Sequence, residues 1–312
     1  MHAPPDAAVT TEGLSRSFGP VAAVDRISFS VAPGEVFGLI GPDGAGKTTL
    51  LRLLAGILDP SEGSATVAGA DVRTQPELLR QRIGYMPQTF ALYRDLTVGE
   101  NLHFFAEAYQ VPRGEIASRT ERLLAFSRLG PFVRKLAEHL SGGMRQKLAL
   151  ACTLIHEPRL LLLDEPTTGV DPVSRREFWS ILYDLNSRGT TVLVATPYMD
   201  EADRCTRIGF MYGGRLLSVA PPEGMKVQMQ GEVLEIVAEP RRRALAVALG
   251  IKAVLTGSVF GDTLHLTVPS SAAAESQVRD ALDRAGISLR SLRVAPASLE
   301  DVFISLMSQA GR

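Results

Sequence analysis

The stretch Gly41-Pro42-Asp43-Gly44-Ala45-Gly46-Lys47-Thr48-Thr49 decides which fold this chain is expected to adopt. The apolar run 35–40 before it has the length of a buried parallel strand, and an apolar helical pattern follows it. Glycines let backbone N–H groups close around phosphate oxygens, and a helix N-terminus attracts anions. Lys47 would reach the β- and γ-phosphates, and the Thr48 hydroxyl would bind Mg²⁺. A flexible glycine turn is the alternative, but strand, spacing, lysine and threonine together favour a nucleoside triphosphate site.

Size and composition limit the classes of protein to which the chain can belong. Its 312 residues allow one large domain and a smaller one, and 45% of them are hydrophobic. A formal net charge of −1 argues against a dedicated nucleic-acid binder. Cys152 and Cys205 lack metal-ligand spacing, which favours a reduced, cytosolic setting. No apolar run reaches the roughly 18 residues of a membrane span, and residues 1–8 resemble a disordered tail rather than a signal peptide.

The pattern along the chain predicts two domains. Residues 9–220 alternate short apolar runs with amphipathic helices, as in an α/β sheet domain. Within that domain, 97–140 has helical patterns only and is predicted to be a helical insertion. After a break at 220–224, residues 225–312 follow a βαββαβ order, which predicts a small α+β, ferredoxin-like domain ending in a helix capped by Ser298. The predicted strands are 27–31, 35–40, 83–86, 160–164, 191–195, 208–212, 233–237, 253–259, 263–268 and 289–294.

Two further motifs carry chemistry. Leu160-Leu-Leu-Leu-Asp-Glu165 is a buried strand that delivers Asp164, a Mg²⁺ partner, and Glu165, a general base, to the carboxyl edge of a parallel sheet. Ser141, Gly142 and Gly143 precede a long helix and form a second anion site. A plain glycine-rich helix start is the alternative for the second motif on its own.

The order of these motifs closely resembles that of the ATP-binding-cassette (ABC) family of P-loop ATPases over residues 9–220. The resemblance implies that Phe18 stacks on adenine and that Gln88 senses Mg²⁺, contributes to catalysis and contacts a membrane partner. It also implies that two chains, identical or different, enclose two ATP molecules. Ser141–Gly143 of one chain then faces phosphates held by the other, with the loop Gly169-Val170-Asp171 at the interface. The implied ATP-binding set is Phe18, Gly41, Pro42, Asp43, Gly44, Ala45, Gly46, Lys47, Thr48, Thr49, Ser141, Gly142 and Gly143, and the implied Mg²⁺ set is Thr48, Gln88 and Asp164.

The chain departs from the family pattern after the strand at 191–195. The family normally has Thr-His there, and the histidine contacts the γ-phosphate, whereas this chain has Thr196-Pro197. Proline has neither an imidazole nor a backbone N–H to donate. Either Glu165 and Mg²⁺ hydrolyse ATP slowly, or this site mainly binds ATP while a histidine-bearing partner performs most turnover. A smaller departure is Asp43, where the family usually has asparagine.

The end of the chain narrows the resemblance. Pro296-Ala-Ser-Leu-Glu-Asp-Val-Phe303 is similar to the appended domain of daunorubicin-resistance-type multidrug exporter ATPases, whose ABC-2 permease is a separate polypeptide. An amphipathic helix that merely docks is the alternative. The leading hypothesis is therefore an ATPase subunit on the cytoplasmic side of the membrane, energising export of a drug or other hydrophobic substrate. A degenerate regulatory cassette is the second, and an ABC ATPase acting on ribosomes or DNA is the third; near-neutral charge and a single cassette argue against the last.

Overall fold

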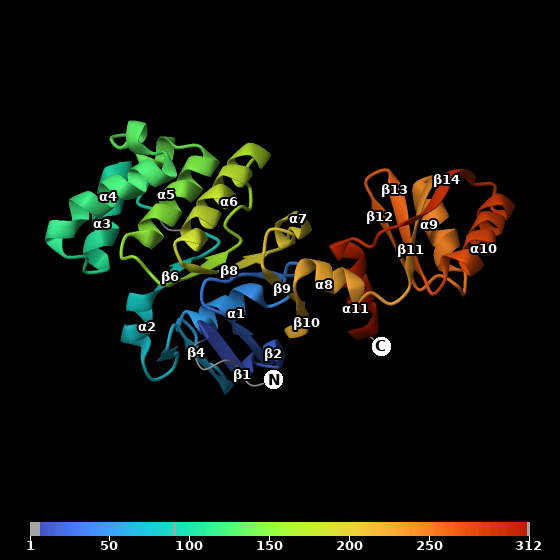
Figure 1. Ribbon diagram of the computed structural model, residues 1–312, viewed down its shortest axis with the longest axis horizontal. Helices are drawn as coiled ribbons and strands as arrows, with labels where there is room; N and C mark the ends of the chain where they lie inside the picture. The colour runs from blue at the N-terminus through green and yellow to red at the C-terminus, as the bar shows by residue number, and fades with distance from the viewer. Residues whose placement is uncertain (1–6, 90–91, 311–312) are drawn as a thin grey trace. The chain divides into compact units, whose positions relative to one another are not determined.

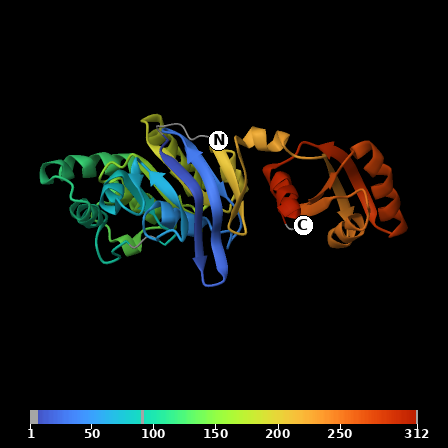
Figure 2. The same cartoon turned by 90° about the horizontal axis from the view of Figure 1, so that it is seen from below.

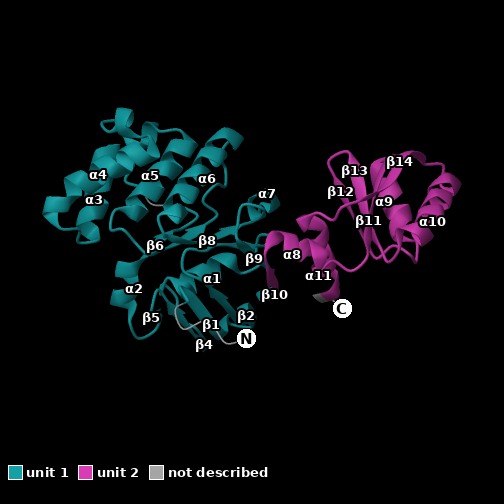
Figure 3. Cartoon of the chain, viewed as in Figure 1, with its two compact units in different colours: residues 1–216 teal, residues 217–312 magenta. Residues whose placement is uncertain are grey.

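The computed structural model describes residues 7–89 and 92–310 of the chain. Two compact units divide it, Met1–Leu216 and Leu217–Arg312 (Figure 3). The chain passes from one unit to the other within β10 (Arg215–Ala220), slightly before the break expected at 220–224. Most of the predicted disordered tail, residues 1–6, lies outside the described residues.

The first unit is built around a parallel sheet that carries the predicted phosphate loop. Its strands are β3 (Val36–Ile40), β6 (Ile83–Met86), β7 (Leu160–Asp164), β8 (Thr191–Thr196) and β9 (Arg207–Tyr212), in the order β10-β9-β3-β8-β7-β6 (Figure 1). The pairs from β9 to β6 are parallel. Every residue of β3, β7 and β8 is buried, which explains why these strands read as continuous apolar runs. All five were predicted.

The first unit also contains an antiparallel sheet, two of whose strands precede β3 in the sequence and two of which follow it. It contains β1 (Val9–Phe18), β2 (Val21–Val31), β4 (Glu62–Val67) and β5 (Ala70–Asp71), in the order β2-β1-β4-β5. Figure 2 shows β1 and β2 in blue as two long strands side by side. The sequence predicted only the second half of β2 and missed the other three strands, as well as β10 and the helix α2 (Pro76–Arg82). These strands mix buried and exposed positions, so they give no continuous apolar signal.

Helices complete the first unit: α1 (Lys47–Leu54), α5 (Gly142–Leu154), α6 (Pro172–Ser187) and the short α7 (Met199–Ala202). Between Thr97 and Leu140 the described residues form α3 (Val98–Ala108), α4 (Arg113–Ser127) and two 3₁₀ turns, η1 (Gly130–Phe132) and η2 (Ala137–His139). The predicted helical insertion is therefore confirmed. A buried cluster that includes Val98, Leu102, Leu148 and Cys152 packs α3 against α5.

The second unit begins with the end of β10 and α8 (Pro222–Val227) and confirms the predicted βαββαβ order. Its elements are β11 (Glu232–Glu239), α9 (Arg241–Leu249), β12 (Thr256–Phe260), β13 (Thr263–Val268), α10 (Ser271–Arg284), β14 (Ser288–Ala295) and α11 (Leu299–Ala310). The sheet is antiparallel, with the order β12-β13-β11-β14. Apolar residues of α9 and α10 pack on one face of it. Ser298 caps α11 as predicted: its Oγ accepts from Asp301 N at 3.2 Å, and its backbone N–H donates to Asp301 Oδ2 at 2.9 Å.

Candidate functional site

The loop 41–46 links β3 to α1 and lies against neighbouring backbone too closely to admit side chains at two of its glycines. A Cβ on Gly41 would lie 2.2 Å from Met211 O, and one on Gly46 would lie 2.2 Å from Ala23 O. Gly44 has open space but a φ of 77°, which favours glycine. The loop is therefore held in a fixed curve at the N-terminus of α1.

Lys47, the first residue of α1, points its ammonium group back into this loop. Its Nζ donates to Gly41 O at 2.9 Å and to Pro42 O at 3.0 Å. The same Nζ lies 3.2 Å from Glu165 Oε1, and both side chains are buried. The buried ammonium group of Lys47 thus contacts two carbonyl oxygens and one carboxylate. An anionic group can bind here by replacing these contacts.

Glu165 follows the last residue of β7 and has the unusual φ of 49° for a residue with a side chain. Its backbone N–H donates to Ala195 O at 2.9 Å, which ties this turn to β8. The carboxylate Oε2 accepts from Gln88 Nε2 at 3.0 Å and from Thr168 Oγ1 at 3.3 Å. Such backbone strain is concentrated at functional sites. Thr168 is a residue that the sequence analysis missed, although its motif Glu-Pro-Thr-Thr directly follows Asp164.

Asp164 is fully buried at the end of β7. Its Oδ1 accepts from Thr48 Oγ1 at 3.0 Å, across 116 residues of chain. Its Oδ2 is buried without a hydrogen-bond partner among the described residues. Burial raises the pKa of this carboxyl. An unpartnered buried carboxylate oxygen beside a threonine hydroxyl is the donor set that suits a hard divalent cation, so these residues fit Mg²⁺.

Most of these groups line one open cavity of about 610 Å³, whereas Gly41, Pro42 and Asp164 are not among its lining residues. The predicted residues Asp43 to Thr49, Gln88 and Glu165 line it. Ala23, Thr168, Pro197 and Tyr198 complete the wall and were not among the predicted site residues. The arrangement can receive a phosphate chain beside a lysine, a cation beside Asp164 and Thr48, and a water beside Glu165.

Comparison with known proteins identifies the family. A family model described as ABC transporter matches residues 24–168. The chain is 42% identical over 311 residues to the probable multidrug ABC transporter ATP-binding protein YbhF of Escherichia coli K12, a match that covers 98% of this chain and 53% of YbhF. It is 38% identical over 304 residues to the Nod factor export ATP-binding protein I of Sinorhizobium fredii, covering 96% of this chain and 86% of that protein. The chain belongs to the ABC transporter ATP-binding proteins.

Solved structures agree with this assignment. An ABC cassette solved as a dimer in a post-hydrolysis state with ADP and phosphate aligns with a TM-score of 0.62 and 26% identity, over 68% of this chain and 98% of that one. The chain spans about half the length of YbhF. The P-loop ABC ATPase fold and the ABC family predicted from the sequence are thereby confirmed.

Some predicted ABC residues lie outside the cavity of this single chain. Phe18 ends β1, is 48% exposed and lies 4.9 Å from the Arg16 guanidinium. Ser141 caps α5, accepting from Met144 N at 3.3 Å. A Cβ on Gly142 would lie 3.8 Å from Gly169 O, and one on Gly143 would lie 2.5 Å from Ser174 Oγ. Gly142 therefore lies beside Gly169 and Gly143 beside Ser174 at the start of α6. The described residues that line the cavity include neither the Ser-Gly-Gly motif nor Phe18.

A polar network surrounds the turn at Pro197, the position at which the sequence comparison expected a histidine. Tyr198 N donates to Thr196 Oγ1 at 3.1 Å, and the Arg175 guanidinium lies 4.1 Å from the centre of the Tyr198 ring. Arg175 Nε lies 3.7 Å from the fully buried Glu201, which accepts from Thr167 Oγ1 at 2.5 Å. Arg175 in α6 thus connects the turn after Pro197 with the Glu-Pro-Thr-Thr segment. The sequence analysis did not single out Arg175 or Glu201.

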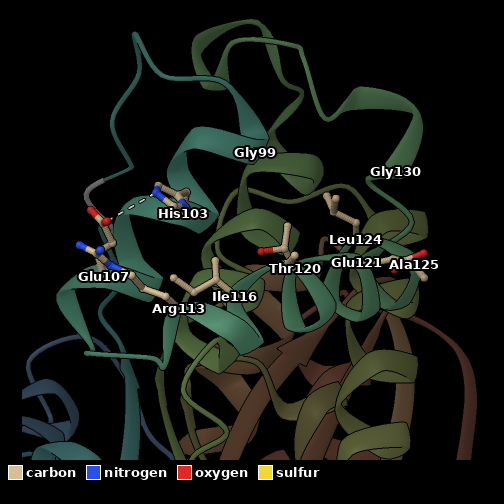
Figure 4. A pocket seen from close by; sticks show the side chains of 11 residues that line it. Gly99, His103, Glu107, Arg113, Ile116, Thr120, Glu121, Leu124, Ala125 and Gly130 are labelled. Carbon is tan, nitrogen blue, oxygen red and sulfur yellow. Dashed lines mark ion pairs between the residues drawn. The ribbon is translucent and has the colours of Figure 1, made fainter.

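A second cavity of about 790 Å³ lies in the helical insertion, away from the phosphate loop (Figure 4). It runs between α3 and α4, and its wall combines apolar side chains with a rim that carries the His103–Glu107 pair, 3.6 Å apart. The lining residues are Gly99, His103, Glu107, Arg113, Ile116, Ala117, Thr120, Glu121, Leu124, Ala125 and Gly130.

Proposed function

We propose that this chain binds and hydrolyses ATP to energise an ABC exporter whose permease is a separate, integral-membrane ABC-2 type polypeptide. The observation that carries the proposal is the convergence of Lys47, Glu165, Asp164 and Thr48 at the carboxyl edge of the parallel sheet. The names of the relatives support the direction of transport, since one is a multidrug protein and the other a Nod factor export protein. Their cargoes differ, which is consistent with a permease that selects the substrate.

The chemistry assigned to the site follows from its hydrogen bonds. Glu165 is the proposed general base: its carboxylate can take a proton from a water attacking the γ-phosphate. Gln88 and Thr168 donate to Glu165 Oε2, and Oε1 pairs with Lys47. When Lys47 exchanges this contact for a phosphate, Oε1 becomes open to that water. Lys47 and the backbone N–H groups at Gly44, Ala45 and Gly46 are proposed to hold the phosphates, with Gly41, Pro42, Asp43, Thr48 and Thr49 completing the loop.

The proposed metal is Mg²⁺. Thr48, Asp164 and Gln88 would hold it, and when bound it would neutralise charge on the phosphate oxygens. The unpartnered Oδ2 of Asp164 supports this assignment.

A second cassette, identical or different, is proposed to complete each ATP site. Ser141, Gly142 and Gly143 would contact phosphates bound to the other chain, and Phe18 would stack on adenine. The exposure of Phe18 and the position of Ser141 outside this chain's own cavity support an intermolecular arrangement. We further propose that 9–220 form the ATPase domain and 225–312 an accessory domain.

The permease is proposed to dock on the helical insertion near Gln88, which would locate the chain on the cytoplasmic face of the membrane. Among residues 7–89 and 92–310, no helix is long and apolar enough to cross a bilayer. The groove between α3 and α4 has the mixed apolar and polar wall that a helix of a permease would need.

One observation favours a second candidate function. Pro197 lines the ATP cavity where the family has its histidine, and it can donate no hydrogen bond. A cassette that mainly binds ATP and pairs with a histidine-bearing ABC ATPase is therefore the alternative.

Replacing Glu165 with glutamine tests the leading proposal. The amide cannot accept a proton, so Glu165→Gln should reduce phosphate release by about 10²-fold or more, the scale of general-base catalysis, while keeping ATP binding. The variant should also accumulate as an ATP-bound dimer, which size-exclusion chromatography with light scattering and an assay of the co-eluting ATP would detect in ATP and Mg²⁺.

Glu12→Gln is the matched control because Glu12 is exposed and lies on β1, outside the cavity. It should turn over as the unmodified chain does. A Glu165→Gln chain that stays monomeric in ATP and Mg²⁺ would count against the paired-cassette proposal. Unchanged turnover in that variant would remove Glu165 as the base.

A further inference from the structure

The four-stranded sheet of residues 217–312 has two edges that differ in character. The edge strand β14 carries Arg290 and Arg293, which pair with Glu239 and Glu235, and its register with β11 shifts between Val237 and Ala238. The edge strand β12, Thr256-Gly-Ser-Val-Phe260, has no charged residue and no proline, and its register with β13 runs without a shift. Charges and irregularities are the features that keep natural edge strands from pairing with other chains. The described edge at β12 lacks both.

An exposed apolar patch borders this unprotected edge. Leu249, Leu255 and Val259 are each 45–49% exposed. Leu255, Gly257 and Val259 share one face of the strand because side chains alternate. A Cβ on Gly257 would lie 3.5 Å from Leu249 Cδ2, so Leu249 at the end of α9 borders the same face. The β12 edge is therefore open to pairing with another strand, and it lies beside apolar side chains that are exposed in the single chain.

We propose that β12 pairs antiparallel with β12 of a second copy of this chain, about a two-fold axis at Ser258, without need of nucleotide. In this register Val259 of one copy lies opposite Gly257 of the other, beside the leucine side chains that pack next to Gly257 (Leu245, Leu249 and Leu266). Val259 then contacts Leu249 of the second copy, and the two sheets join into one of eight strands.

Charge favours a second copy over an unrelated strand as the occupant. The five residues of β12 are neutral, so self-pairing brings no like charges together. The antiparallel arrangement also brings the start of one β12, preceded by Lys252, near the end of the other, followed by Asp262. The Asp262 carboxylate is 96% exposed and is held by Arg241 at 3.1 Å on one side only. The two-fold axis therefore brings opposite charges, rather than like charges, into the same region twice.

Cysteine cross-linking of the full chain tests the pairing. Residues directly opposite in an antiparallel pair have Cα atoms about 4.5–5.5 Å apart, within the range of a disulfide. Ser258→Cys should therefore form a disulfide-linked dimer in the absence of nucleotide under mild oxidation. The natural thiols, Cys152 and Cys205, do not interfere, because both are buried and burial raises the pKa of each.

The matched control is Ser291→Cys, an exposed serine on the other edge strand of the same sheet. Held opposite each other, the Ser258→Cys thiols should cross-link at least about tenfold faster than the freely diffusing Ser291→Cys thiols. Adding Val259→Lys to Ser258→Cys should remove most of that advantage, because the lysine charges both edges. Equal rates at the two cysteine positions would overturn the proposal.

A second experiment separates this dimer from one driven by ATP. Lys47→Ala impairs nucleotide binding in the proposed function, yet Ser258→Cys should cross-link equally well in that background and without ATP. Cross-linking that requires ATP and is lost with Lys47→Ala would contradict a nucleotide-independent edge while supporting the ATP-driven pairing. Rapid cross-linking in both backgrounds would support pairing through β12. If the Glu165→Gln chain with Val259→Lys added also fails to dimerise with ATP, that result would count against the ATP-driven dimer.

Discussion

Pro197 follows β8 and lies in the wall of the cavity that also contains Lys47 and Glu165. The family normally offers an imidazole here, whereas proline offers no donor toward a γ-phosphate. The surrounding turn is nevertheless well held, since Tyr198 bonds Thr196 and stacks under Arg175. The missing donor, rather than a loose turn, is therefore the feature expected to limit hydrolysis.

Restoring the donor should raise turnover. A single positioned donor to a transition state is typically worth about 10²–10³ in rate, so Pro197→His should increase phosphate release by roughly tenfold even with imperfect geometry. Pro197→Ala is the matched control, because it removes the ring without adding an imidazole. Steady-state phosphate release at saturating ATP is the measurement. A wild-type chain that is already as fast as ordinary transport ATPases, and unchanged by histidine, would leave Glu165 as a sufficient catalyst.

At the scale of elements, burial on both faces decides what the sequence can predict. β3, β7 and β8 are buried throughout and appear as apolar runs, whereas β1 mixes buried and exposed residues without a regular period and was missed. In the same way, the phosphate loop was predictable because its residues are contiguous. The contact of Glu165 with Lys47 depends on β8 lying between β3 and β7, and its contact with Gln88 depends on β6 lying beside β7. No local sequence pattern contains this strand order.

His156, just after α5, connects the helical region to the parallel sheet. Its Nε2 lies 2.8 Å from Ile83 O at the start of β6, and its ring stacks on Tyr109 with 4.0 Å between centres. Burial lowers the pKa of His156, with a smaller contribution from repulsion by Arg119. The unfolded chain therefore takes up the proton at a higher pH than the folded chain. Stability is full above the ordinary histidine pKa of about 6.5 and falls as the pH drops toward the folded value.

His156→Gln should flatten this acid limb, because the amide can still donate to Ile83 O but does not titrate. The slope from one such group is at most about 1.4 kcal/mol per pH unit. Urea unfolding midpoints of the full chain between pH 7.5 and pH 5 would measure it. His103→Gln, at an exposed position, serves as the control and should leave the slope unchanged. If the slope survives in His156→Gln, the acid sensitivity originates elsewhere.

At the scale of the whole molecule, the proposed function requires that hydrolysis at the phosphate loop act on a membrane polypeptide. Gln88 lies at the ATP-site end of the connection to the permease, since its amide donates a hydrogen bond to the Glu165 carboxylate. The segment after it leads to α3, whose residues Gly99, His103 and Glu107 form one wall of the groove in Figure 4. A permease bound in that groove would contact α3, and a shift of α3 would be passed to the segment that carries Gln88.

A charged, bulky residue in the groove should therefore uncouple the chain from its permease without stopping ATP hydrolysis. Ala117→Arg changes an exposed groove residue of α4, and Ala108→Arg makes the same change at an exposed position of α3 outside the groove. Co-purification of the tagged chain with a permease of the proposed type should fall about tenfold or more for Ala117→Arg, the cost of an unpaired charge at an interface. Ala108→Arg should co-purify normally, and both variants should retain the basal phosphate release of the free chain. Equal loss in both variants would point to a general charge effect on the insertion, and normal co-purification of Ala117→Arg would exclude the groove as the docking surface.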